Sequence, residues 1–385
     1  MIGTGMIFPI IPIIFTDPSS PSFILHGSTQ QQQFLIAGLV TALFGIMQFI
    51  AAPILGELSD VFGRKKLLSI GIGTLAFSQI LFALGITQKS LLILLISRSI
   101  AGLAAANFAI AQASIADITE PKDRAKNFGL IGGAFGIGFI LGPVLSGWIA
   151  HYTGSATAPF WFAGILGFLN LLSCSLFLPE TLKNPKTTRS FHILKGIHNL
   201  RQAYIDKDVR RIHLASFLYM AGFAFLVSFS GIFLVTQLKF AASDVGTFYG
   251  VVGAFVVITQ LFILRILSNK FKERTILRVS LLTLALAISI YPFIQNPIMI
   301  YLIIPFIAIP QGLSAANMIA LVSKSVPPER QGAALGINSS LVALSQGIIP
   351  IVAGVGSGLI GLKSPFIAGG ILIIIAWTVL FAKSK

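Results

Sequence analysis

Apolar runs repeat along the whole chain and are separated by short segments that contain charges, prolines or glycines. An α-helix rises about 1.5 Å per residue, so roughly 20 apolar residues span the hydrocarbon core of a bilayer. The pattern therefore predicts an all-α polytopic membrane protein with twelve transmembrane helices. The predicted spans are 1–15, 34–55, 67–86, 91–117, 127–150, 159–178, 209–236, 244–265, 275–295, 297–322, 331–355 and 362–382.

The composition agrees with a lipid environment. The 385 residues have a mean hydropathy of +0.90, and 55% of them are hydrophobic while only 10% are charged. A soluble domain of this size would need far more charge to cover its surface. The net charge of +15 could suggest nucleic acid. Because the basic residues lie in short loops rather than on one continuous face, we expect no nucleic-acid partner.

Lysines and arginines are distributed unevenly between the loops. The loops after even-numbered spans, together with the C-terminus, hold 23 of them, and the loops after odd-numbered spans hold 3. Loops rich in basic residues stay on the cytoplasmic side of a membrane. We therefore expect a multi-pass protein of the plasma (inner) membrane with both termini in the cytoplasm.

The residue types needed for catalysis or metal binding are not arranged for it. The five histidines are scattered, and the single cysteine, Cys174, lies inside an apolar run. Zinc sites need clustered ligands, and nucleophilic catalysis needs a base beside the nucleophile. We expect no metal, no cofactor and no enzymatic activity.

Three short motifs occur twice in the same order, with offsets between 206 and 210 residues. The repetition predicts two similar six-helix bundles, 1–182 and 209–385, related by an axis along the membrane normal. Residues 183–208 form the basic linker between them, with apolar positions at the spacing of an amphipathic surface helix. The paired segments are 102–107 with 312–317, 58–62 with 267–271, and 121–124 with 327–330.

Four ordered motifs, together with these repeats, resemble the major facilitator superfamily. Within it the chain is similar to the twelve-span drug:proton antiporters that include the tetracycline efflux proteins. The resemblance covers nearly the whole chain and implies a secondary transporter that works by alternating access. The motifs are Gly3–Pro12 in span one, Gly56–Lys66 after span two, Leu94–Ala106 in span four and Gly138–Gly147 in span five.

The motif after span two contains Gly56, Asp60, Gly63, Arg64 and Lys65. The resemblance implies that these residues latch the two halves together on the cytoplasmic side in one state. Physically, Asp60 could accept backbone N–H groups from a neighbouring helix N-terminus, while the two basic side chains meet that carboxylate or lipid phosphates. Simple anchoring by positive charge is the alternative.

The motif in span five, which the resemblance associates with antiporters, includes Gly138, Gly142, Pro143 and Gly147. Its glycines leave a helix face without side chains, so another helix can approach backbone to backbone. Pro143 removes one backbone hydrogen bond and should bend the helix. We expect a tight seam between the halves; packing within one half is the alternative.

Two residues are candidates for coupling transport to protons. Arg98 lies inside a span, where facing lipid would cost roughly 2.5–3.5 kcal/mol, so we expect it to face the cavity. Snorkelling to the outer interface is the alternative. The resemblance links this arginine to proton coupling. None of the twelve acidic residues lies in mid-span, which leaves Asp117, at the inner end of span four, as the best titratable candidate.

The first predicted span is short. The fifteen residues before Thr16 would reach about 22 Å, less than the core thickness of about 30 Å. In the tetracycline exporters that the chain resembles, an acidic residue precedes the Gly-x-Gly motif, whereas here Met1 stands beside it. We therefore expect the chain to start at an internal methionine, with span one truncated and its coupling acid upstream.

Amides at membrane depth are candidates for lining a substrate cavity, although buried amides also tie helices together. The proposed cavity residues are Gln48, Asn107, Gln112, Gln260, Gln311, Asn317, Asn338 and Gln346. We expect a monomer that exports a small amphipathic or aromatic compound against proton influx. A metabolite uniporter or symporter of the same fold is one alternative, and a transport-dead sensor or truncated remnant is another.

Overall fold

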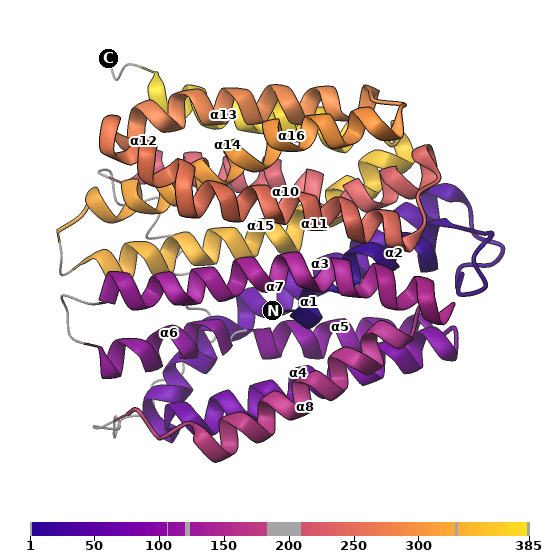
Figure 1. The fold of residues 1–385 in the computed structure, drawn as a ribbon, viewed down its shortest axis with the longest axis horizontal. Helices are drawn as coiled ribbons and strands as arrows, with labels where there is room; N and C mark the ends of the chain where they lie inside the picture. The colour runs from indigo at the N-terminus through magenta and orange to yellow at the C-terminus, as the bar shows by residue number, and fades with distance from the viewer. Residues whose placement is uncertain (1, 106, 120–123, 183–208, 328–329, 383–385) are drawn as a thin grey trace.

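A computed structural model describes the chain except for residues 1, 106, 120–123, 183–208, 328–329 and 383–385 (Figure 1). The predicted amphipathic helix of the linker lies outside the described residues. Ten described helical segments are long and apolar enough to cross a membrane, α1 and α2 form a shorter apolar segment, and α7 has 30 residues. These segments match the twelve predicted spans, and every described element is helical, which confirms the fold class.

We refer to the helices before the linker as the N-terminal set and to those after it as the C-terminal set. The N-terminal set consists of α1 (Ile2–Gly5), α2 (Ile7–Thr16), α3 (Gln30–Phe62), α4 (Arg64–Thr87), α5 (Leu91–Ala105), α6 (Asn107–Ile118), α7 (Arg124–Thr153) and α8 (Ala158–Phe177). The C-terminal set consists of α10 (Arg210–Leu238), α11 (Ala242–Ile258), a π-helical turn (Thr259–Ile263), α12 (Leu264–Lys270), α13 (Glu273–Ile290), a 3₁₀ turn (Tyr291–Phe293), α14 (Pro297–Lys324), α15 (Gln331–Leu359) and α16 (Ser364–Phe381).

The helix ends differ from the predicted spans because local capping, and not hydropathy, sets them. Helix α3 begins at Gln30, ahead of the apolar run, where Thr29 and Gln32 form a capping box with Thr29 N donating to Gln32 Oε1 at 2.8 Å. It ends at Phe62, and the next residue, Gly63, has a φ of 95° that only glycine adopts readily. The predicted span 34–55 was therefore too short at both ends.

The two sets meet along two pairs of helices. In Figure 1 the N-terminal set, in indigo to magenta, fills the lower half of the view, and the C-terminal set, in red to yellow, fills the upper half. Contacts between the sets run mainly from α3 to α15 and from α7 to α11, with α2 against α10. The remaining helices, such as α8 and α13, pack onto their own set and form its outer side.

The closest contacts between the sets lie toward one end of the molecule, which we call the Asp17 end because residues 17–29 are there. A Cβ atom added to Gly45 would lie 2.5 Å from the carbonyl carbon of Gln346, and one added to Gly246 would lie 2.6 Å from the Pro143 oxygen. Toward the opposite end, which we call the Arg64 end, a Cβ at Gly56 would meet no described atom within 4 Å.

Helix α15 shows the same asymmetry along its length. A Cβ at Gly347 would lie 2.9 Å from a side-chain carbon of Ile46, whereas one at Gly336, nearer the Arg64 end, would meet no atom of the described residues within 4 Å. Small residues permit this close approach, and packing is then the main force that joins helices in lipid. The sets therefore touch most closely from the middle of the seam helices toward the Asp17 end, and we call this contact the seal.

We expect Gly45→Ala to weaken this seal, because backbone atoms of α15 already occupy the space that the added methyl group would need. Overpacking costs about 1–3 kcal/mol, which corresponds to a roughly five-fold or larger shift between sealed and open states. Thr41 lies on α3 beside the seam. A cysteine introduced there, in a Cys174→Ser background, should react faster with a membrane-impermeant thiol reagent.

Gly336→Ala is the matched control, since it adds the same methyl group to the seam helix α15 where space is open. It should leave the labelling rate at position 41 unchanged. Equal labelling rates in the two variants would show that the glycine contact does not hold the seal.

Candidate functional site

The connection between α3 and α4 is a single residue, Gly63, at the Arg64 end. Its positive φ turns the chain so that the end of α3 and the start of α4 share one corner. A Cβ at this position would overlap the carboxylate of Glu180, which follows α8. Glycine is therefore required here by both the backbone conformation and the space available.

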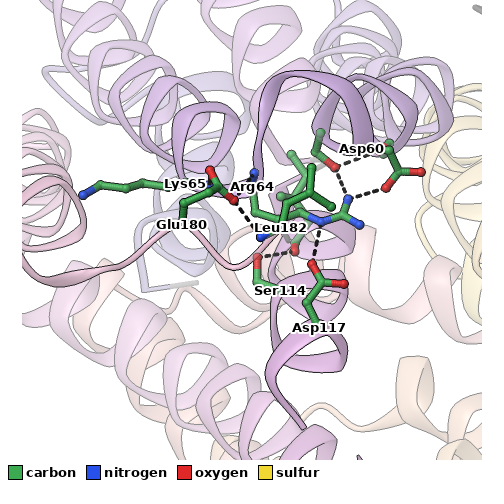
Figure 2. Close-up of polar contacts among 10 residues, drawn as sticks. Asp60, Arg64, Lys65, Ser114, Asp117, Glu180 and Leu182 are labelled. Carbon is green, nitrogen blue, oxygen red and sulfur yellow. Dashed lines mark hydrogen bonds and ion pairs between the residues drawn. The ribbon is translucent and has the colours of Figure 1, made fainter. Parts of the chain in front are cut away.

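Arg64 occupies the centre of this corner, and its residue is only 7% exposed. Its Nη1 atom lies 2.6 Å from Asp60 Oδ1, its Nε atom lies 3.0 Å from Asp117 Oδ2, and Nη1 also donates to Ser59 Oγ at 2.5 Å (Figure 2). The fixed fork of donors on a guanidinium suits several acceptors at once. The side chain thus joins the end of α3 to the end of α6.

A second carboxylate receives the backbone of the same corner. Glu180 accepts the backbone N–H of Arg64 at 2.9 Å and that of Lys65 at 3.2 Å, and it also accepts the N–H of Leu182 at 3.0 Å (Figure 2). The first N–H groups of a helix lack partners within the helix, and the dipole there favours an anion. Glu180 therefore caps α4 from the segment that leads into the linker.

These hydrogen bonds control the ionisation of Glu180. Partial burial raises the pKa of its carboxyl group, but the backbone N–H groups of Leu182, Arg64, Lys65 and Thr181 together outweigh burial and hold the pKa below its ordinary value. The carboxylate is therefore charged throughout the neutral range.

The structure brings the predicted latch residues together but distributes their roles differently. Asp60 lies beside the Arg64 side chain, whereas the carboxylate at the α4 N-terminus is Glu180, which the sequence analysis did not select. Lys65 contributes its backbone N–H, and its side chain points away from Asp60 in Figure 2. Gly56 accepts a hydrogen bond from Ser59 Oγ through its carbonyl.

The span-five motif contacts helices of both sets. A Cβ at Gly142 would lie 3.0 Å from the Cα of Gly5 in α1, and one at Gly147 would lie 3.0 Å from the Cα of Gly246 in α11. Pro143 and Gly138 both lie near Gly5 on the α1 side. The small face thus serves packing within the N-terminal set and the seam between the sets at the same time.

Arg98 is buried with 6% of its surface exposed, and it packs against α3. Its guanidinium carbon lies 4.7 Å from the ring centroid of Phe44, and its buried Nε atom has no hydrogen-bond partner. Phe44 lies near the middle of α3, so the side chain does not snorkel to the Asp17 end. A cation–π contact contributes about 0.5–2 kcal/mol, less than the several kcal/mol that desolvation of an ion costs.

Three of the predicted cavity amides link helices within the C-terminal set. Asn338 Oδ1 accepts a hydrogen bond from Ser216 Oγ at 2.6 Å, and Gln311 Oε1 accepts one from Tyr219 Oη at 2.7 Å. Gln260 lies in the π-helical turn and donates to the carbonyl of Gly312 at 3.3 Å. These contacts bind α10 to α15, α10 to α14 and the π-helical turn to α14.

The other amides have different surroundings. Asn317 is buried and donates to the Leu313 carbonyl within its own helix at 2.8 Å. Asn107 packs against Gly71 of α4, and its Oδ1 atom is buried without a partner. Gln48 is half-buried, and Gln112 and Gln346 are exposed.

Two hollows lie between the sets near the seal. A small cavity of about 20 Å³ is bounded by Phe8, Thr41 and Tyr249 among others. A wider hollow of about 440 Å³ opens at the Asp17 end and is lined by residues from both sets, including Asp17, Gln33 and Lys239.

We expect Asp60→Asn to reduce transport about ten-fold or more without lowering the amount of protein in the membrane. The amide removes the charge that faces Arg64, and one charge-assisted hydrogen bond in such a site is worth about 1.5–3 kcal/mol. Initial transport rates normalised to membrane abundance measure the effect.

Glu273→Gln is the control, because it disrupts an ion pair with Lys324, whose side chain is 67% exposed. Exposed pairs contribute little, so transport should change less than two-fold. A parallel loss of activity and abundance in Asp60→Asn would instead favour the anchoring interpretation.

We expect Glu180→Gln to lower thermal stability at neutral pH by about 1 kcal/mol, the usual effect of losing a helix cap. Because folding lowers the pKa of this carboxyl group, its stabilisation is complete above the ordinary glutamate pKa and is lost only as pH falls through the lowered value. The difference in melting temperature between parent and variant should therefore stay constant from about pH 5.5 to 8 and shrink under stronger acid. A difference that changes between pH 6 and 8 would contradict this assignment.

Comparison with known proteins gives the same architecture. A family model described as Major Facilitator Superfamily matches residues 1–308 and, in a second match, 212–385. The class C tetracycline resistance protein of Escherichia coli is 28% identical over 91% of this chain and 85% of its own length. The quinolone resistance protein NorA of Staphylococcus aureus is 28% identical over 92% of this chain and 86% of its own length. A crystal structure of the human organic anion transporter MFSD10 (TETRAN) covers 98% of this chain and 95% of its own, with a TM-score of 0.74 and 23% identity.

Proposed function

Because the chain belongs to the Major Facilitator Superfamily, we propose that it exports a small amphipathic or aromatic compound in exchange for protons. Its relatives are transporters, so the chain is a multi-pass membrane transporter and not an enzyme. The names of the relatives, which refer to tetracycline, quinolone and multidrug resistance, support drug-like substrates and export.

The one-sided seal supports alternating access as the mechanism. The sets touch closely at the Asp17 end, while Gly56 and Gly336 have free space at the Arg64 end. The Arg64 end carries the basic residues that predict the cytoplasmic side. This conformation then corresponds to an inward-facing state, and the free glycines are positions where the sets can approach when the molecule faces outward.

The resemblance implied a latch between the two halves, but the contacts described above for the corner around Arg64 join segments of the N-terminal set. We propose this corner as a conformational latch that acts within that set. The corner contains a guanidinium that contacts two other helices and a carboxylate that caps a helix N-terminus. Both sets of contacts form only when α3, α4, α6 and the segment after α8 keep their relative positions. A shift of α6 or of that segment breaks charge-assisted contacts. The corner therefore favours discrete arrangements over gradual movement.

Asp117 is the proposed titrating group, because its carboxylate accepts Arg64 Nε and its side chain is 25% exposed. Protonation would remove the negative charge and loosen the link between α4 and α6. Arg64 and Arg98 cannot take this role, since a guanidinium remains protonated. The coupling would thus act through the latch.

We further propose that residues 1–182 and 209–385 are the two moving bundles and that the chain works as a monomer in the plasma membrane with both termini cytoplasmic. The second match of the family model, which starts at residue 212 inside the C-terminal set, supports this division.

Purified protein in liposomes should acidify or alkalinise the lumen when a tetracycline or a quinolone gradient is applied, as measured with a trapped pH-sensitive dye. Asp117→Asn should reduce the proton signal about ten-fold while substrate movement down its own gradient continues, because only the titrating carboxylate is lost. Substrate flux without any pH change in the parent protein would favour a uniporter or a symporter coupled to another ion. No ligand-dependent flux of any tested compound would favour a sensor.

A further inference from the structure

Among the described residues, the charge of Arg98 has no carboxylate counter-ion. The sequence has no acidic residue between Asp17 and Glu57 and none between Asp60 and Asp117, which removes α3, α4 and α5 at membrane depth as sources. Asp60 of α3 and Asp117 of α6 both form ion pairs with Arg64. The only partner of the guanidinium among the described residues is the Phe44 ring.

Such an arrangement is unusual for a buried arginine. Buried charges are normally paired and hydrogen-bonded, because removing an ion from water is costly. A planar guanidinium offers five N–H donors, and a ring face satisfies none of them by hydrogen bonding. The site therefore holds an unused capacity to bind an anion, and this capacity does not contribute to folding.

The ring that Arg98 contacts belongs to α3, the helix that forms the seam with α15. This ring partner, Phe44, is adjacent to Gly45, which packs against Gln346 of α15. Thr41 lies about one turn before Phe44 on α3, and it lines the small cavity together with Phe8 and Tyr249. Gln48, a half-buried amide, lies about one turn after Phe44 on the same helix. The guanidinium thus lies over the Phe44 ring, and a hydroxyl and an amide lie one turn away from that ring along α3.

We propose that Arg98 is a specificity-determining residue that binds an anionic group, such as a carboxylate, on the transported compound. The proposal rests on the proposed transport function and narrows its substrates to aromatic compounds that carry a negative charge. The apolar body of the ligand would pack against the rings near the seam, and its anionic group would supply the missing counter-ion. Neutral analogues would leave the cation unpaired and bind less well.

The test uses binding, so that it does not depend on transport. Purified protein in detergent is titrated with naphthalene-2-carboxylate and with naphthalene-2-carboxamide, which has the same rings and no charge. We expect the carboxylate to bind about ten-fold or more tightly than the carboxamide. In Arg98→Gln the ratio of the two dissociation constants should fall to near one, and in Arg98→Lys it should be intermediate, because the charge stays and the fork is lost.

Arg278→Gln is the matched control, because Arg278 also lies over an aromatic ring, 5.1 Å from the centroid of Phe381, but on an exposed face of α13. It should leave the ratio unchanged. The melting temperature of ligand-free Arg98→Met provides an independent readout. It should equal or exceed that of the parent, since an unpaired buried charge is replaced by an apolar side chain.

Several results would overturn the proposal: equal affinity of the parent for carboxylate and carboxamide, a retained preference in Arg98→Gln, or a marked loss of stability in Arg98→Met. If chloride or phosphate raised the melting temperature of the parent protein above that in gluconate buffer as much as naphthalene-2-carboxylate does, the site would be assigned to a free inorganic anion instead. Specific binding of naphthalene-2-carboxylate without flux in liposomes would support anion recognition by Arg98 and reject the transport function separately.

Discussion

The rest of the structure depends on the backbone-to-backbone contact between the two helix sets. On α3 and α15, and again on α7 and α11, the carbonyl of one helix occupies the space where the other would place a side chain, as at Gly246 and Pro143. Lipid tails are as apolar as the helices, so burial of apolar surface does not hold such helices together, and close packing has to. Such a contact needs glycine wherever the two helices cross. It holds the helices together strongly where their backbones touch, and it is lost where the helices move apart. This contact makes a one-sided seal possible without any covalent link between the sets.

The positions of the charges follow from the same environment. Most basic residues lie at the ends of spans, where water and lipid phosphates are accessible, and the pair Lys324–Glu273 is an example on the surface. Arg64 is buried, yet it lies at a helix corner and is satisfied by Asp60, Asp117 and Ser59. The contacts with Asp60 and Ser59 are local in sequence, whereas the contact with Asp117 joins segments 53 residues apart, so that part of the corner depends on how the N-terminal set is assembled.

Much of the architecture could be predicted from the sequence, because hydropathy directly reports what a bilayer requires. The number of spans, the all-helical class and the family follow from apolar runs and from motifs such as Gly56–Lys66. The helix ends could not be predicted, since the capping box at Thr29 and the positive φ of Gly63 act outside the apolar run. The π-helical turn at Thr259–Ile263 also leaves no signal in hydropathy, because it changes hydrogen bonding and not composition.

Several residues of the candidate site could be predicted from the sequence, but the side chains that they contact could not. Asp60 and Arg64 are neighbours on consecutive helices, and a motif can specify them, whereas Glu180 reaches the corner only through the packing of α8 against α4. The amides show the same limit. Asn107 and Asn317 are related by the sequence repeat, yet one packs on Gly71 of a neighbouring helix and the other bonds within its own helix. Residue type at membrane depth indicates a need for a partner, and only the tertiary structure decides which partner meets it.

The two buried arginines show how a transporter of this kind can respond to charge. A guanidinium keeps its proton, so its environment changes only when something else gains or loses charge beside it. Arg64 has carboxylates as partners, and a proton arriving at one of them would change the balance of the proposed latch. Among the described residues, the partner of Arg98 is only an aromatic ring, so the proposed change there comes with a ligand. A ligand shifts a conformational equilibrium only by the difference in its affinity for the two states. Because Phe44 adjoins the seam at Gly45, an anion bound at Arg98 would lie beside the contact that distinguishes those states, whereas one bound at an exposed arginine such as Arg278 would not.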